Sequence, residues 1–176
     1  MIGLKKKLGA LMPLALCLLV LCGVGALAQR QLLPSAGAGA RPDIKVALAG
    51  SVEREGKQIS LDKAQAVQPG EILSWHITSA NEGDGAARDY KAVGHIPAGT
   101  TFVAGSAAGE NGSTVTYSID GGKTFSTQPI VEEKQADGTT KRTPAPVSMY
   151  TEVRYEWSDA LAAGGKLSAS YKVRVK

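Results

Sequence analysis

The chain has 176 residues, of which 43% are hydrophobic, and it carries 20 Lys and Arg against 16 Asp and Glu. This length is enough for one domain with a sizeable core. Three of the basic residues, Lys5 to Lys7, lie at the N-terminus, and without them the formal net charge falls from +4 to +1. No Lys- or Arg-rich run remains after them, so the sequence predicts no nucleic-acid partner.

Residues 1–28 have the layout of a secretory signal peptide. Lys5 to Lys7 form a positive n-region, an apolar run extends from Leu8 to Leu27, and Ala26-Leu27-Ala28 forms a cleavage site before Gln29. An uncleaved signal anchor is the alternative, because about 20 apolar residues can span a bilayer. The sequence therefore predicts an exported protein, periplasmic or extracellular at the cell surface. It would contact the membrane only through the leader, if the leader stays uncleaved.

Both cysteines of the chain, Cys17 and Cys22, lie in this leader. The chain from Gln29 onward can therefore form no disulfide and offers no thiolate nucleophile or metal ligand. We expect its domain to be held together by a hydrophobic core alone.

Residues 29–42 are rich in Ala, Gly, Ser and Pro, which predicts a flexible linker. Residues 43–176 show period-2 alternation of apolar and polar residues, broken by Gly, Pro and Asn turns. The strands expected from this alternation are residues 44–52, 58–67, 72–79, 90–96, 100–103, 114–119, 123–125, 150–157 and 167–175. Residues 135–146 are polar and contain two prolines, so we interpret them as an exposed loop.

The sequence after the linker shows no sustained helical period, and we predict an all-β fold, an antiparallel Ig-like β-sandwich over residues 43–176. A barrel is the alternative. All nine aromatic residues lie between Trp75 and Tyr171. Five of them are expected on inward faces, where each buries about 150–250 Å². They are Phe102, Tyr117, Tyr155, Trp157 and Tyr171.

Five short motifs follow one another in a fixed order. They are Val67-x-Pro69-Gly70-Glu71; Trp75-x-Ile77-x-Ser79-x-Asn81-x-Gly83; Ile96-Pro97-Ala98-Gly99-Thr100-Thr101-Phe102-Val103 with Gly105-Ser106-Ala107; Tyr117-Ser118-x-Asp120-Gly121-Gly122-Lys123-x-Phe125; and Tyr150-Thr151-x-Val153-Arg154-Tyr155. Together they resemble the bacterial conserved repeat domain, the eleventh of the numbered domains of unknown function. The resemblance covers Val67 to the C-terminus. It implies an Ig-like fold in an exported envelope or surface protein, and no catalytic residues. The single copy here, and His95 before Ile96-Pro97, depart from the family.

Two polar turns contain the candidate site residues, which we interpret as structural. Ser118-x-Asp120-x-Gly122-x-Thr124-Phe125 resembles the Asp-box of sialidase-type propellers, in which the carboxylate accepts backbone N–H bonds across a turn. Asn81 and Gly83 are expected to shape a second tight turn. Calcium binding by Asp120 is the rival for the first turn, but nothing else nearby supplies the several oxygen ligands that Ca²⁺ needs. Cation binding through Glu82 and Asp84 is the rival for the second turn.

No combination of residues predicts a catalytic site, a metal site or a cofactor. His76 and His95 are the only histidines and lie on separate expected strands. The sequence has no G-x-S-x-G nucleophile elbow. Paired-carboxylate hydrolysis has no support either.

The function that we expect is that of an exported, non-enzymatic module that binds an unidentified envelope or surface protein. Its edge strands or loops would make the contact, with residues 132–146 as the best surface. A carbohydrate-binding module is the alternative, with Trp75, Tyr90 and Trp157 as a stacking platform. The in-phase alternation of the two tryptophans with apolar residues favours the core instead. An envelope enzyme is the third possibility.

Overall fold

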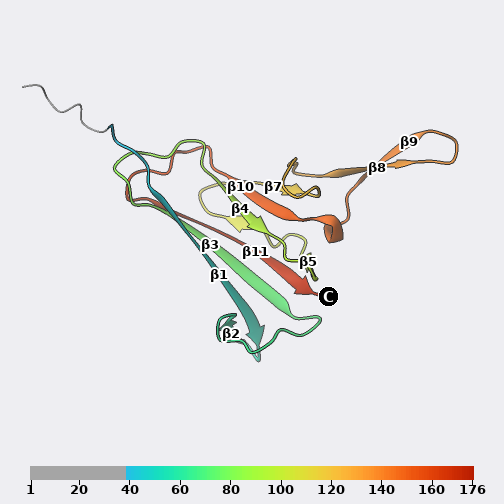
Figure 1. Ribbon diagram of the computed structural model, residues 1–176, viewed down its shortest axis with the longest axis horizontal. Coiled ribbons are helices and arrows are strands. Elements are labelled where there is room, and N and C mark those ends of the chain that lie inside the picture. Colours follow the sequence, from blue (N-terminus) through green and yellow to red (C-terminus); the bar gives the residue numbers. More distant parts are fainter. Residues whose placement is uncertain (1–38) are drawn as a thin grey trace, which may run out of the picture. The chain divides into compact units, whose positions relative to one another are not determined.

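A computed structural model describes residues 39–176, and these residues form an all-β domain, as predicted (Figure 1). Its strands pair antiparallel throughout. The only helical element in the described part is one 3-10 turn, η1 (Val147–Met149). The predicted signal peptide and linker residues 29–38 lie outside the described residues.

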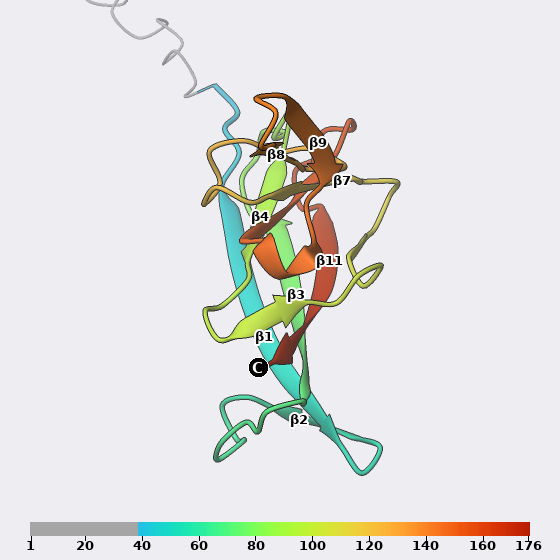
Figure 2. The same cartoon turned by 90° about the vertical axis from the view of Figure 1, so that its right-hand side faces the viewer.

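The strands of residues 39–176 form two packed sheets and a separate hairpin, and no closed barrel. The larger sheet has the order β2-β1-β3-β11-β5, with β6 also paired to β11. Its strands are β1 (Ile44–Arg54), β2 (Lys57–Ser60), β3 (Ile72–Asn81), β5 (Thr100–Phe102), β6 (Ala108–Gly109) and β11 (Lys166–Val175). The smaller sheet has the order β4-β10-β7 and consists of β4 (Lys91–His95), β7 (Thr114–Ser118) and β10 (Glu152–Glu156). Figures 1 and 2 show the two sheets as separate layers of a sandwich-like arrangement.

The core lies between the two sheets because alternate residues of their central strands are apolar. On β11, Leu167, Ala169, Tyr171 and Val173 are all buried, and the residues between them are not. Val153 and Tyr155 of β10 are fully buried opposite them. This period-2 alternation is the signal that predicted both strands from the sequence.

Two buried tyrosines connect the layers through hydrogen bonds to backbone carbonyls. Tyr171 of the larger sheet donates to the carbonyl of His95 at 2.6 Å, and Tyr155 of the smaller sheet donates to the carbonyl of Ser170 at 2.6 Å. Burial raises the pKa of Tyr171 to about 12, so its phenol is neutral and able to donate. Gly94 leaves room for the Tyr171 ring, because a Cβ there would lie 2.9 Å from Tyr171 Cζ.

Of the five aromatic residues expected inside, four are buried: Phe102, Tyr155, Trp157 and Tyr171. Tyr117 is only half-buried and packs with Phe102 and Tyr150, at ring-centroid distances of 5.3 and 4.8 Å. Trp75 is also half-buried, on the core-facing side of β3 beside Gly50.

Residues 135–142 are exposed, as predicted, but the prediction of a loop over residues 135–146 is wrong. Residues 130–144 form a hairpin of β8 (Ile130–Lys134) and β9 (Thr140–Pro144), which pair only with each other. Both strands lack apolar alternation, because neither packs on the core, and the sequence pattern therefore does not mark them as strands. The turn residues Asp137 and Gly138 join them, and the Asp137 carboxylate accepts from the Thr139 N–H at 2.9 Å.

The predicted return strand at residues 123–125 is also wrong. The N–H groups of Lys123 and Thr124 donate to the Asp120 carboxylate, at 3.1 and 3.0 Å, and so cannot pair with β7. Only an isolated bridge between Tyr117 and Ser126 remains of the expected ladder.

Candidate interaction surfaces

The turn after β7 is organised by Ser118 and Asp120. The Asp120 carboxylate accepts hydrogen bonds from the Lys123 and Thr124 N–H groups and from the hydroxyls of Ser118 and Thr124. The Ser118 hydroxyl accepts in turn from the N–H groups of Asp120 and Gly122. The carboxylate oxygens therefore serve the turn itself rather than an open ligand position.

The electrostatics of Asp120 follow from these bonds. Donors from Thr124, Ser118 and Lys123 stabilise the charged carboxylate and hold the Asp120 pKa well below its usual 3.8. Gly121 and Gly122 both have positive φ, of 71° and 82°, which side chains disfavour. The sequence Asp120-Gly121-Gly122 thus supplies both the acceptor and the backbone freedom that the turn requires.

Thr151 ties this turn to the smaller sheet, and it was not predicted as a site residue. Its hydroxyl accepts from the Gly121 N–H at 3.1 Å and donates to the Ser118 carbonyl at 3.2 Å. Nearby, the Arg154 guanidinium carbon lies 4.0 Å from the Phe125 ring centroid. Arg154 is on the face of β10 opposite Val153 and Tyr155, so Phe125 covers the outside of the smaller sheet rather than the core.

The second turn is built around Asn81, which is 1% exposed. Its amide Nδ2 donates to the carbonyls of Gly85, Leu161 and Ala162, and its Oδ1 accepts from the N–H groups of Asp43 and Gly83. Gly83 is needed because a Cβ there would lie 2.5 Å from the Asp43 nitrogen. Asn81 therefore joins three chain segments that are far apart in sequence.

The two histidines lie on different sheets and do not converge. His76 is exposed on β3 and points away from the smaller sheet, whereas the next residue, Ile77, is buried on the core-facing side. His95 is exposed on β4, with Nδ1 3.3 Å from Glu152 Oε1. Within residues 39–176, no group of three or more His, Cys, Asp or Glu side chains is placed to hold a metal ion.

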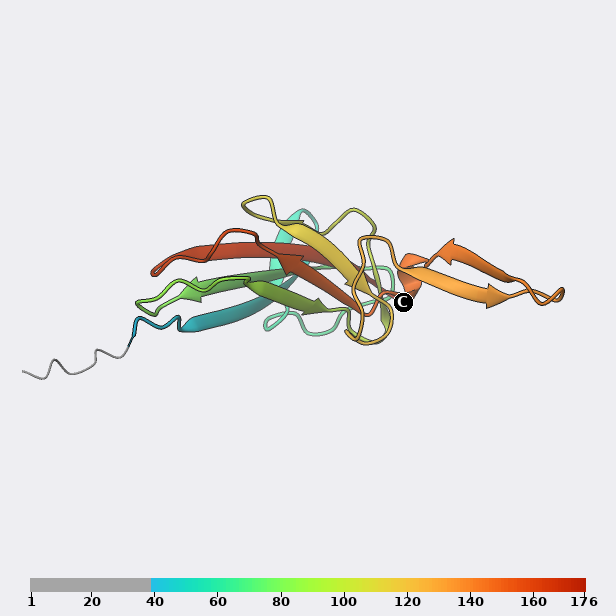
Figure 3. The ribbon, with the colours of Figure 1, turned by 90° about the horizontal axis from the view of Figure 1, so that it is seen from above.

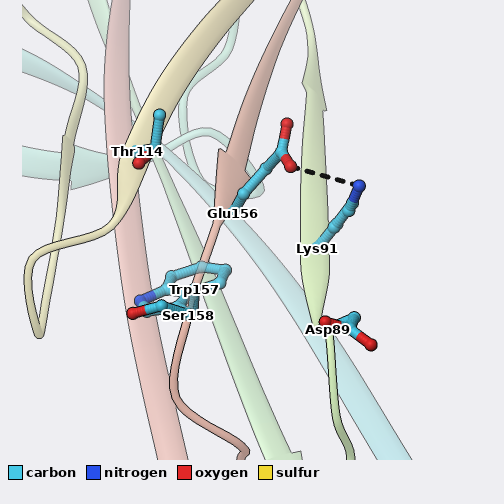
Figure 4. A pocket seen from close by; sticks show the side chains of 6 residues that line it. All are labelled: Asp89, Lys91, Thr114, Glu156, Trp157 and Ser158. Carbon is cyan, nitrogen blue, oxygen red and sulfur yellow. Dashed lines mark ion pairs between the residues drawn. The ribbon is translucent and has the colours of Figure 1, made fainter.

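A pocket of about 400 Å³ lies at one end of the smaller sheet, where β4 and β7 begin and β10 ends. Figure 4 shows the side chains that line it. Lys91 and Glu156 form an ion pair across it, with Nζ and Oε2 3.1 Å apart. The hydrogen bond from Lys91 lowers the pKa of Glu156, which keeps this carboxylate ionised at neutral pH. The two charged groups thus satisfy each other.

The aromatic residues of the alternative sugar platform do not share one exposed surface. Trp157 is 4% exposed, stacks on Tyr90 at a centroid distance of 5.7 Å, and donates its Nε1–H to the Glu110 carbonyl at 2.8 Å. Trp75 lies on β3 of the other sheet.

The β8–β9 hairpin projects away from both sheets (Figure 3). Its base is fixed, because Pro129 and Ala145 are buried and the Ala145 N–H donates to the Pro129 carbonyl at 2.8 Å. Beyond the base, nearly every side chain is exposed, and Arg142 pairs across the strands with Glu132 at 2.8 Å. The hairpin therefore presents exposed, charged side chains beyond a base that is buried and hydrogen-bonded.

The described residues define a sandwich-like all-β domain of two antiparallel sheets with one projecting hairpin. No helix in residues 39–176 is long and apolar enough to cross a membrane. Comparisons with models of protein families, with curated proteins and with solved structures find no match.

Proposed function

We propose that this chain is an exported, non-enzymatic Ig-like module of the cell envelope that binds another protein through the β8–β9 hairpin. The observation that carries the proposal is the hairpin itself. It pairs with no other strand, and its exposed side chains contribute little to the core. Loops and projecting elements on a rigid scaffold are the usual positions of binding residues.

Two further features support the proposal. The antiparallel sheets, packed through alternate inward residues, agree with the Ig-like architecture that the five sequence motifs imply. The hairpin presents an uneven charge pattern: β8 carries Glu132 and Glu133 followed by Lys134 at its end, and β9 carries Lys141 and Arg142. A partner of complementary charge would be oriented by this pattern.

The test compares the unchanged protein with two variants. Each is used to capture envelope proteins, and its affinity for the repurified partner is then measured. In the first variant, residues 132–142 are replaced by two glycines, which keeps the buried base. In the second, Glu132→Arg with Arg142→Glu reverses the charges and preserves the cross-strand pair.

We expect the shortened variant to stay folded and to lose the partner, with an affinity at least about tenfold weaker, or 1.4 kcal/mol. The charge-reversed variant should weaken binding while keeping the hairpin. Unchanged partner recovery by the shortened variant would refute the hairpin as the binding element.

A further inference from the structure

Among residues 39–176, no strand pairs with the outer backbone edge of the N-terminal half of β1. The Gly50 carbonyl accepts from the Leu61 N–H at 2.9 Å, and the Asp43 carbonyl accepts from the Glu82 N–H, on the β3 side, at 2.7 Å. Backbone groups alternate sides along a strand, so those of Ile44, Val46 and Leu48 point away from β3. β2 pairs with β1 only from Ser51 onward, and no other described strand reaches this edge.

This part of β1 also carries apolar side chains that remain exposed to solvent. Val46 and Leu48 are 60% and 57% exposed, although they share the core-facing side of the sheet with Ser79 and Ile77, their partners on β3. Edge strands are commonly protected by charges, prolines or bulges. Here the only charge among residues 44–50 is Lys45, and the Asp43 carboxylate 3.0 Å away already pairs with it.

Residues 41–43, just before β1, do not block this edge. The Arg41 N–H donates to the Asp84 carboxylate at 2.7 Å, and the Arg41 carbonyl accepts from the Gly85 N–H at 3.1 Å. These bonds hold residues 41–43 against the β3–β4 turn, on the opposite side of β1 from its free edge.

We propose that a second copy of this chain pairs antiparallel with this edge, so that two β1 strands join the larger sheets across a two-fold axis. The sequence of the edge is complementary to itself. With Val46 opposite Val46 of the second copy, Ile44 faces Leu48 and Lys45 faces Ala47. Apolar side chains then meet apolar side chains, and no like charges are directly opposed.

The neighbouring registers are less favourable. Shifting the pairing so that Ile44 faces Val46 places Lys45 opposite Lys45 of the second copy. The opposite shift pairs Ile44 with Gly50, whose carbonyl is already bonded to Leu61. The register centred on Val46 is therefore the one that the edge supports.

The paired strands would bury the exposed apolar side chains of both copies in one groove between the two smaller sheets. The surface does not include the β8–β9 hairpin. The dimer and the proposed partner binding can consequently fail independently of each other, and removal of residues 132–142 should leave the dimer unchanged.

The first test is sedimentation of the protein expressed from the full-length chain, over micromolar concentrations. We expect a monomer–dimer equilibrium that Val46→Lys weakens at least about tenfold, without unfolding, because Val46 is 60% exposed. Met149→Lys, at a residue that is 43% exposed, is the matched control and should have no effect. A monomer at every concentration would overturn the proposal. So would a dimer that is disrupted by Val93→Lys on β4 and not by Val46→Lys.

The second test fixes the register by oxidative cross-linking, in a background with Cys17 and Cys22 changed to serine. Residues in a hydrogen-bonded antiparallel pair have Cα atoms about 5.5 Å apart, within disulfide range. Val46→Cys should therefore cross-link to itself, and Ala49→Cys, which would face Asp43, should not. Efficient cross-linking of Ala49→Cys with none at Val46→Cys would contradict the proposed pairing.

Discussion

At the scale of single residues, Asp120 links the acid stability of the domain to one turn. Its pKa is lowered in the folded chain, so its hydrogen bonds stabilise the fold above the ordinary value of 3.8 and are lost as the pH falls below it. Asp120→Asn keeps the shape of the side chain but removes the charge that strengthens four accepted bonds.

We therefore expect Asp120→Asn to lower the free energy of unfolding at pH 7, and the deficit to shrink between pH 4 and pH 2. Urea denaturation at both ends of this range measures the effect. Asp159→Asn is the matched control, because Asp159 is exposed and its carboxylate accepts no hydrogen bond within residues 39–176, so this change should leave the stability nearly unchanged at both pH values. A deficit that is constant with pH would contradict the role of the Asp120 charge.

The buried amide of Asn81 connects segments that are far apart in sequence, because it both donates and accepts hydrogen bonds. Asn81→Ala leaves several backbone groups without partners and should cost about 3 kcal/mol of unfolding free energy. Asn81→Asp places a carboxylate against the carbonyls of Gly85 and Leu161. Its stability should rise as the pH falls from 7 to 4, because a protonated acid can again donate. Denaturation curves at pH 7 and pH 4 test this prediction. Equal stability of Asn81→Asp at both pH values would show that the amide is dispensable.

At the scale of elements, the strands that pack on the core were predictable and the others were not. β10 alternates strictly and β3 and β11 alternate over most of their length, because one face of each strand is buried. The alternation of β1 was equally visible, but the sequence could not show that Val46 and Leu48 stay exposed on the core-facing side of the sheet. Burial at these positions depends on which other segments cover them, which is a tertiary property.

The turns show the same division between local and tertiary information. The hydrogen bonds around Asp120 involve near neighbours, and the Asp-Gly-Gly sequence pointed to them. The contacts of Asn81 with Leu161 and Ala162 span about eighty positions, and no local pattern marks them. Thr151 was part of a recognised motif, yet only the structure places its hydroxyl on the Asp120 turn.

The β8–β9 hairpin should be the least stable element, because a two-stranded hairpin without core contacts is marginal in water. We expect limited trypsin digestion to make its first cut within residues 40–176 at Lys134, Lys141 or Arg142. Mass spectrometry of the early fragments identifies the site. The variant with residues 132–142 replaced by two glycines is the control and should persist longer. An earlier cut in β1 or β11 would show that the sheets open before the hairpin.

At the scale of the whole molecule, the larger sheet brings together strands from the two ends of the described domain. β3 lies between β1, which begins the domain, and β11, which ends it. The larger sheet therefore cannot be completed until β11, the last strand in the sequence, has paired with β3. Folds with such distant pairings usually form in milliseconds to seconds. The sequence contained the alternation of all three strands, but their order in the sheet had to come from the structure.

The same arrangement determines how the domain would respond to tension. β1 and β11 are both antiparallel to β3 and hence parallel to each other, so Ile44 and Val175 lie at opposite ends of the sheet (Figure 1). A pull on these two ends slides β1 and β11 in opposite directions along β3. Their ladders then bear the load together, instead of opening one hydrogen bond at a time. If neighbouring chains or a membrane anchor pull on this domain, we expect it to yield late and as a unit.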